Sequence, residues 1–125
     1  MNADRTHLTT KCMNLSCEAQ RFLENIQTAE PNTYPLLALQ GDLICNKANL
    51  LMEDLTEVSK DKMITLTALQ MVEAVKMQRD TIQDVTNRIK SAGSIVAASK
   101  EAVIEAQLKK LEDLKASLSE YSKNL

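Results

Sequence analysis

Between Tyr34 and Val58 the chain reads YPLLALQGDLICNKANLLMEDLTEV. Apolar or small side chains recur here at alternating steps of three and four residues, which places them on one face of an α-helix. They are Leu37, Gly41, Ile44, Ala48, Leu51, Leu55 and Val58. Leu36, Leu43 and Leu50 lie beside this row and widen it, so we expect contact with two neighbouring helices. Gly41 lowers helix propensity by about 1 kcal/mol relative to Ala, and its place in the row predicts close approach of another helix.

The same spacing recurs through the rest of the chain. The first row contains Leu8, Cys12, Leu15, Ala19, Phe22, Ile26 and Ala29. A later row, shifted in phase, contains Ile64, Ala68, Met71, Val75, Ile82, Val85, Ile89 and Val96. The last contains Ile104, Leu111, Leu114, Leu118, Tyr121 and Leu125. Four amphipathic segments with short connections predict an all-α fold, an antiparallel up-down bundle of four helices with coiled-coil-like packing.

Three breaks predict helices over about 6–29, 34–58, 61–92 and 94–124, within a single domain of residues 1–125. The clearest break contains Pro31 and Pro35, because proline lacks the N–H that a helix interior requires. Asn32 or Thr33 is expected to cap the second helix, with Pro35 in its first turn. The other two breaks are weaker in sequence.

The second break, at residues 59–62, offers Ser59 or Asp61 as the cap of a third helix, and a continuous helix is the alternative. The third break is at Gly93 and Ser94. Without a turn there, residues 61–125 would form a rod of roughly 95 Å at 1.5 Å per residue. Such a rod would require partner chains, and we favour the turn.

The composition excludes several classes of function. Fifteen basic and seventeen acidic residues are distributed without a basic stripe, so we expect no nucleic-acid partner. Apolar runs fall short of the roughly 18 residues that cross a bilayer, so we expect no transmembrane segment and at most peripheral membrane contact. Three cysteines without a CxxC pair, and no secretory leader, predict a reducing, cytoplasmic setting.

Catalytic and metal-binding groups are scarce. His7 is the only histidine, which removes imidazole-based catalysis and di-iron sites. Zinc ligands could come from His7 and the three cysteines, Cys12, Cys17 and Cys45. However, side chains five residues apart on a helix point roughly 140° away from each other. Phosphate-binding and nucleophile motifs are also missing. The sequence therefore predicts a protein that is not an enzyme and that holds no cofactor or metal.

The C-terminal row is wider than one neighbouring helix requires, and we expect it to bind a partner. The residues are Leu108, Leu111, Leu114, Leu118, Tyr121 and Leu125. Among the methionines, Met71 is expected to fill the core. Met63 and Met77 are candidates for a partner-facing surface.

Two glutamines, Gln78 and Gln107, interrupt apolar rows. If the chain turns at Gly93, they lie at nearly equal heights, fifteen residues before it and fourteen after it (78 to 93, and 93 to 107). We therefore predict a hydrogen bond between them that determines register or partner choice. Replacing both with Leu is expected to raise thermal stability and to loosen that choice.

These features favour a non-catalytic protein–protein interaction module. It would be a helical subunit, adaptor or tether of a larger assembly, and its partners would be other helical proteins or a second copy. The alternative is a helical bundle that binds lipid or another apolar ligand at a membrane surface. A net charge of −2 and the low aromatic content, 2%, weaken that alternative.

Overall fold

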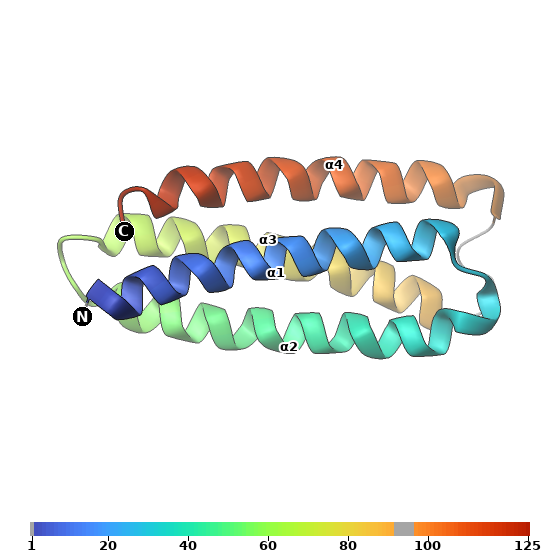
Figure 1. Ribbon diagram of the computed structural model, residues 1–125, viewed down its shortest axis with the longest axis horizontal. Coiled ribbons are helices and arrows are strands. Elements are labelled where there is room, and N and C mark those ends of the chain that lie inside the picture. The colour runs from blue at the N-terminus through green and yellow to red at the C-terminus, as the bar shows by residue number, and fades with distance from the viewer. Residues whose placement is uncertain (1, 92–96) are drawn as a thin grey trace.

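The computed structural model describes residues 2–91 and 97–125, with side chains for residues 7–91 and 100–125. These residues form α1 (Asn2–Thr28), a 3₁₀ turn η1 (Pro31–Thr33), α2 (Tyr34–Val58), α3 (Thr65–Lys90) and α4 (Ala97–Ser122), and no strand. Successive helices run in opposite directions, so the two ends of the chain lie at the same end of the molecule (Figure 1). The predicted all-α, up-down arrangement of four helices is confirmed.

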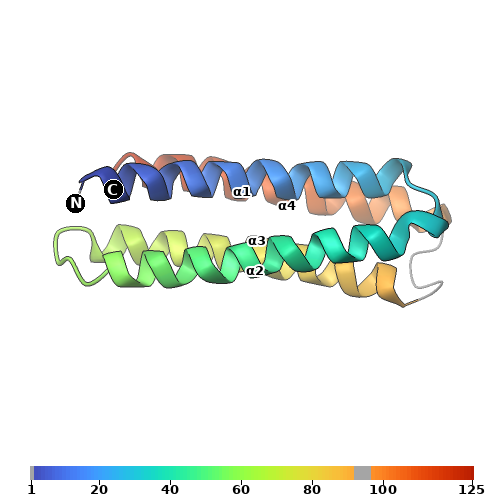
Figure 2. The ribbon, with the colours of Figure 1, turned by 60° about the horizontal axis from the view of Figure 1, so that its bottom comes forward.

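The helices are arranged in two layers, with α1 beside α4 in one and α2 beside α3 in the other (Figure 2). Contacts between α1 and α2, and between α3 and α4, join the layers. Among the described residues the backbones of α2 and α4 are not neighbours, so these helices stand at opposite corners of the bundle. Each helix therefore has two main neighbours and leaves one side towards solvent.

The predicted rows form the core. In α1 the buried side chains include Leu15 and Phe22, the only phenylalanine of the chain. Met71 is completely buried, as predicted. The other members of the four rows are buried or pack against the core, except Ala29, which is half-buried at the end of its row, and Val96, which lies outside the described residues. Each fully buried Leu, Ile or Phe contributes about 1.5–3 kcal/mol, so these rows hold the helices together.

Gly41 lies where three helices meet, as its place in the row predicted. A Cβ built on Gly41 would fall onto Oγ1 of Thr86 in α3 and 2.9 Å from Cζ of Phe22 in α1. Any larger residue would have to push one of these side chains away. Glycine thus allows α2 to lie close to both of its neighbours.

The first turn of α2 begins where predicted but is held differently. Thr33 is the N-cap residue, yet its side chain makes no capping bond. Its Oγ1 instead donates to the carbonyl of Glu30 at 2.7 Å. Pro35 lies in the first turn of the helix, as expected. The 3₁₀ turn before α2 therefore uses the hydroxyl that a cap would otherwise need.

The third helix begins later than predicted, at Thr65, and neither Ser59 nor Asp61 caps it. The carboxylate of Asp61 accepts a hydrogen bond from the N–H of Met63 at 3.0 Å, so it stabilises a turn. Thr65 Oγ1 also donates to the carbonyl of Ser59 at 2.6 Å. The first helix, predicted to begin at about residue 6, begins at Asn2, because residues 2–6 contain no proline or glycine to stop it. The predicted turn at Gly93 and the Ser94 cap lie outside the described residues.

Candidate interaction surface

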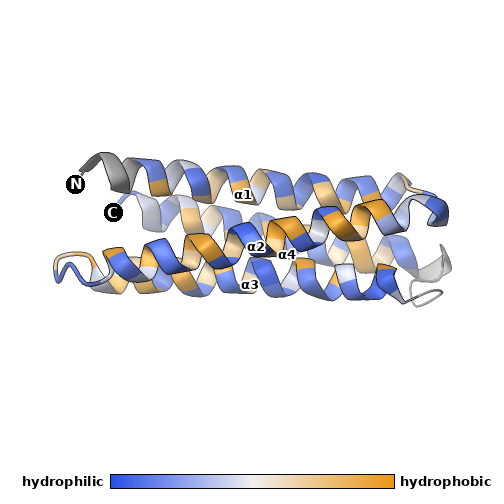
Figure 3. Cartoon of the chain, turned by 90° about the horizontal axis from the view of Figure 1, so that it is seen from below, coloured by the Kyte–Doolittle hydropathy of each residue, from blue (hydrophilic) through white to orange (hydrophobic). Residues whose placement is uncertain are grey.

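Helix α2 carries a second row of leucines that the bundle does not cover. Leu36 is 72% exposed, and Leu39, Leu43 and Leu50 are each 61% exposed. Steps of three, four and seven residues place these four side chains on one side of the helix. Figure 3, in which α2 lies in front, shows apolar residues recurring along it. We call these four residues the outer leucine stripe.

The remaining large apolar side chains that are exposed lie in α3 and in the connection before it. They are Met63, Leu66, Leu69 and Met77. Both methionines that the sequence offered as surface candidates are therefore exposed, Met63 almost fully. Among the described residues, α1 and α4 carry no large apolar side chain that is exposed to this degree. The exposed apolar surface thus belongs to the α2–α3 half of the bundle.

Polar bridges border the outer leucine stripe on both sides. Towards α1, Lys47 bonds Glu18 at 3.0 Å and Asp54 bonds Lys11 at 3.3 Å. Towards α3, Lys90 bonds Asp42 at 2.9 Å. On the same side, Arg79 donates to the side-chain carbonyl of Asn49, also at 2.9 Å. An apolar row with a polar border is the usual composition of a protein-binding surface.

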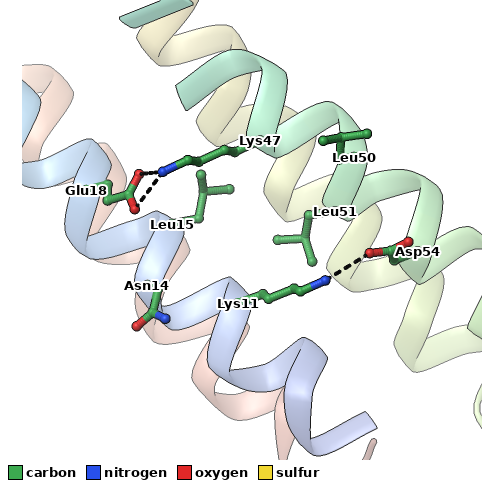
Figure 4. Close-up of a pocket in the computed structure, with 8 residues that line it drawn as sticks. All are labelled: Lys11, Asn14, Leu15, Glu18, Lys47, Leu50, Leu51 and Asp54. Carbon is green, nitrogen blue, oxygen red and sulfur yellow. Dashed lines mark hydrogen bonds and ion pairs between the residues drawn. The ribbon is translucent and has the colours of Figure 1, made fainter. Parts of the chain in front are cut away.

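A shallow groove of about 280 Å³ continues this surface towards α1. Its two ion pairs, Glu18–Lys47 and Lys11–Asp54, span the gap between the helices, with Leu15 and Leu51 between them (Figure 4). Leu50 belongs both to the groove and to the outer leucine stripe. Because its charges are paired with each other, the groove offers an apolar floor and no reactive group.

The residues predicted to bind a partner lie mostly inside the bundle or against its core. Leu111, Leu114 and Leu118 are buried in the core. Leu108, Tyr121 and Leu125 are partly buried and pack against that core. The wide row of α4 is occupied by the neighbouring helices of the same chain. A partner could reach it only if α4 left the bundle, so the candidate surface is on α2 instead.

The predicted hydrogen bond between Gln78 and Gln107 is not formed. Gln78 is buried, but its Nε2 donates to Oγ of Ser16 in α1 at 2.8 Å. Its Oε1 has no hydrogen-bond partner. Gln107 is only half-buried on α4. The polar contact inside the core therefore joins α1 to α3 across the bundle, and Ser16 gave no signal of it in the sequence.

The three cysteines occupy different environments and do not converge. Cys12 and Cys45 are buried, whereas Cys17 is exposed. Burial raises the pKa of the Cys12 thiol from 9.0 to about 12. Burial, and then the charge of Asp42, also raise the pKa of Cys45, whose thiol donates to the carbonyl of Arg79 at 3.7 Å. Neither buried thiol is activated as a nucleophile.

These pKa shifts predict selective alkylation. At about pH 8, iodoacetamide should modify Cys17 of the folded protein while Cys12 reacts at least roughly 100-fold more slowly. In concentrated guanidinium chloride, the control, all three should react alike, as peptide mass spectrometry would show. Equal rates at Cys12 and Cys17 in the folded protein would contradict the buried environment.

The Cys12 pKa also gives a pH dependence of stability. Its folded-state pKa, about 12, lies above the ordinary value of 9.0. The folded protein therefore retains a proton that the unfolded chain loses above that ordinary value. The free energy of unfolding should accordingly fall as the pH rises from about 9 towards 12, with no contribution from this thiol at lower pH.

Two other kinds of site are absent from the described part of the chain. No group of three or more His, Cys, Asp or Glu side chains there is arranged to hold a metal ion. No described helix is both long enough and apolar enough to cross a membrane. Comparisons with protein families, with curated proteins and with solved structures find no match to this chain. The fold and the surface thus define a four-helix bundle with an uncovered row of leucines.

Proposed function

We propose that this protein is a non-catalytic protein–protein interaction module that binds helical partners through the outer leucine stripe. The observation that carries the proposal is the exposure of Leu36, Leu39, Leu43 and Leu50, at 61–72%. Globular proteins seldom leave leucines in a row exposed unless a partner covers them. A row with helical spacing is suited to another helix, whose side chains would pack between the leucines.

The chemistry of the described residues supports a role without catalysis. Enzymes need a nucleophile, an acid–base pair or a metal next to a cavity. Here the buried thiols have raised pKa values, and the charges of the α1–α2 groove are paired. The protein would therefore act through the shape and apolar character of α2, as a subunit, adaptor or tether.

Binding at a membrane surface is the alternative, and the charge of α2 argues against it. The helix carries four carboxylates, Asp42, Glu53, Asp54 and Glu57, and one ammonium, Lys47, a net charge of −3 (one minus four). Amphipathic helices that bind anionic lipids carry Lys and Arg on their polar face. An acidic helix without aromatic anchors at its apolar border favours a protein partner.

Affinity capture tests the proposal. The tagged protein would be compared with a Leu39→Lys/Leu43→Lys variant in a lysate of the cells that produce it. Burying two leucines contributes about 3–6 kcal/mol, so the variant should retain at least roughly tenfold less of any specific partner. A Leu66→Lys/Leu69→Lys variant is the matched control, because these leucines are also exposed but lie on α3.

The same three proteins would be mixed with vesicles of anionic and of neutral lipid. We expect no binding to either. Equal capture of partners by the wild type and the α2 variant would contradict the proposal. Binding to vesicles that the α2 variant loses would favour the membrane alternative.

A further inference from the structure

We propose that the outer leucine stripe binds a second copy of this chain, with the two α2 helices side by side, parallel and in register. This inference rests on the proposed function and names the partner. It follows from two features of α2, neither of which would be needed to bind an arbitrary helix. These are a heptad pattern on the exposed side and complementary charges on its flanks.

The exposed side of α2 follows the heptad of a two-stranded coiled coil. Leu36, Leu43 and Leu50 lie seven residues apart, at one core position of the heptad. Leu39, Asn46 and Glu53 occupy the other core position, three residues after each of these leucines, so the apolar seam ends at Leu50. In a parallel pair in register, each residue would meet its own copy. Asn46 would then meet Asn46, and a polar pair in such a seam specifies register.

The charges that flank the stripe match in this arrangement. In parallel coiled coils, a residue on one flank meets the residue five positions later on the opposite flank of the partner helix. Asp42 is on the flank towards α3 and Lys47 is on the flank towards α1. Asp42 of each copy would therefore meet Lys47 of the other, which gives two opposite-charge contacts by symmetry.

Both side chains remain available for these contacts. The side chain of Asp42 is 40% exposed and that of Lys47 is 58% exposed. Within each copy, Lys90 donates to both carboxylate oxygens of Asp42, at 3.0 and 2.9 Å. Lys47 donates to both oxygens of Glu18, at 3.1 and 3.0 Å. Association would create a row of alternating charge, from Lys90 through Asp42 to Lys47 and Glu18 of the second copy.

Antiparallel pairing lacks this complementarity. The register that sets Leu39 against Leu50 brings Asp42 to Asn49 and Lys47 to Gln40. Shifting by one heptad in either direction brings Asp42 to Asp42 or Lys47 to Lys47, which repel. The parallel arrangement therefore pairs both the leucines and the flanking charges of Asp42 and Lys47, and its Glu53–Glu53 contact lies beyond Leu50, at the end of the seam.

The association should be weak. Four leucines per copy supply less than the roughly 800 Å² that each partner buries in a standard interface. We expect a dissociation constant on the order of 10–100 µM. Sedimentation equilibrium over this concentration range should therefore show a reversible monomer–dimer equilibrium for the wild type.

Charge reversal tests the arrangement. Asp42→Lys alone would set a new ammonium against Lys47 of the other copy, and Lys47→Glu alone would set a new carboxylate against Asp42. Each single variant should therefore dimerise at least roughly tenfold more weakly than the wild type. A mixture of the two variants should form heterodimers whose association constant, on a logarithmic scale, recovers at least half of what each single variant lost. In the heterodimer, one contact pairs the two introduced charges, and the other is the original contact of Asp42 with Lys47. Leu43→Lys should abolish dimerisation and Leu66→Lys, the control on α3, should not. Circular dichroism would verify that every variant is folded.

A monomeric wild type throughout this range would overturn the inference, as would single variants that dimerise like the wild type or a mixture that fails to restore association.

A Leu50→Cys/Cys17→Ser variant adds an independent test of whether the two helices are parallel. Position 50 meets its own copy in the parallel pair, so the variant should form a disulfide-linked dimer on mild oxidation. In the antiparallel register with Leu39 against Leu50, the two cysteines would lie roughly 16 Å apart along the axis and would not link. The proposed function is tested separately: a wild type that stays monomeric could still capture another protein.

Discussion

Gly41→Ala is expected to destabilise the bundle by about 2 kcal/mol, although alanine is the better helix former by about 1 kcal/mol. The reason is steric, because the new methyl group would fall onto Thr86 Oγ1 and lie 2.9 Å from Phe22 Cζ. Either α2 moves away from its neighbours or two buried side chains leave their positions. Thermal and urea unfolding followed by circular dichroism would measure the loss, which corresponds to a fall in melting temperature of roughly 5–10 °C.

A second variant separates this steric effect from other effects of the substitution. Thr86→Ala in the Gly41→Ala protein removes the hydroxyl that the new methyl group would meet. It also removes a buried hydroxyl that has no hydrogen-bond partner. The double variant should therefore regain more than half of the lost stability. A Gly41→Ala protein at least as stable as the wild type would show that helix propensity outweighs the contact.

Ser16→Ala is the second substitution with a large expected effect, a loss of about 2 kcal/mol. Gln78 is 1% exposed, and its side chain makes one hydrogen bond, which the Ser16 hydroxyl accepts. Without Ser16, the whole carboxamide of Gln78 would be buried and unpaired, since its Oε1 has no partner in the intact protein. Chemical unfolding of this variant and of the wild type would measure the difference.

Substitution of Gln78 should cost much less stability than substitution of Ser16. Gln78→Leu removes the whole buried carboxamide, fills a similar volume and leaves only the Ser16 hydroxyl without this bond, so its stability should lie within about 1 kcal/mol of that of the wild type. The Ser16→Ala/Gln78→Leu double variant leaves neither group unpaired and should be at least as stable as the wild type. Destabilisation of similar size by both single substitutions would indicate instead that both residues act by packing. Because Gln107 makes no hydrogen bond with Gln78, any gain from replacing both glutamines with Leu should come from removing the Gln78 carboxamide.

The fold could be predicted because burial imposes a period on the sequence. In α2 the row from Leu37 to Val58 recurs at the helical spacing and lies against α1 and α3, although Leu36, Leu43 and Leu50, which widened it in the sequence, are exposed. Gly41 could be interpreted for the same reason, since a small residue within such a row indicates a close helix contact. These inferences need only the helical repeat and no knowledge of which helices are neighbours.

The exposed leucines of α2 could not be located in this way, because hydropathy identifies apolar rows without showing what covers them. The rows of α2 and α4 are both wider than one contact needs. In α4, Leu108 packs on the core, whereas in α2 the equivalent widening residues Leu36 and Leu43 extend beyond both neighbours. The difference depends on how each helix is rotated in the bundle, which is a property of the whole assembly.

The polar contact in the core was missed for a related reason. Heights measured from a turn place Gln78 and Gln107 at the same level, but they do not show which way each side chain points. Gln78 points across the bundle to α1, where Ser16 lies next to the buried Leu15. A serine among apolar neighbours is too common a feature to reveal its partner 62 residues away.

Photo-crosslinking from position 43 tests most directly whether the outer leucine stripe is the working surface of this protein. A benzophenone side chain would replace Leu43 in one protein and Ala106, exposed on α4, in another, each in the cells that make the protein. We predict a light-dependent covalent adduct with a protein, including a second copy of this chain, from position 43 and none from position 106. The absence of any protein adduct from position 43, or its appearance only from position 106, would contradict the account.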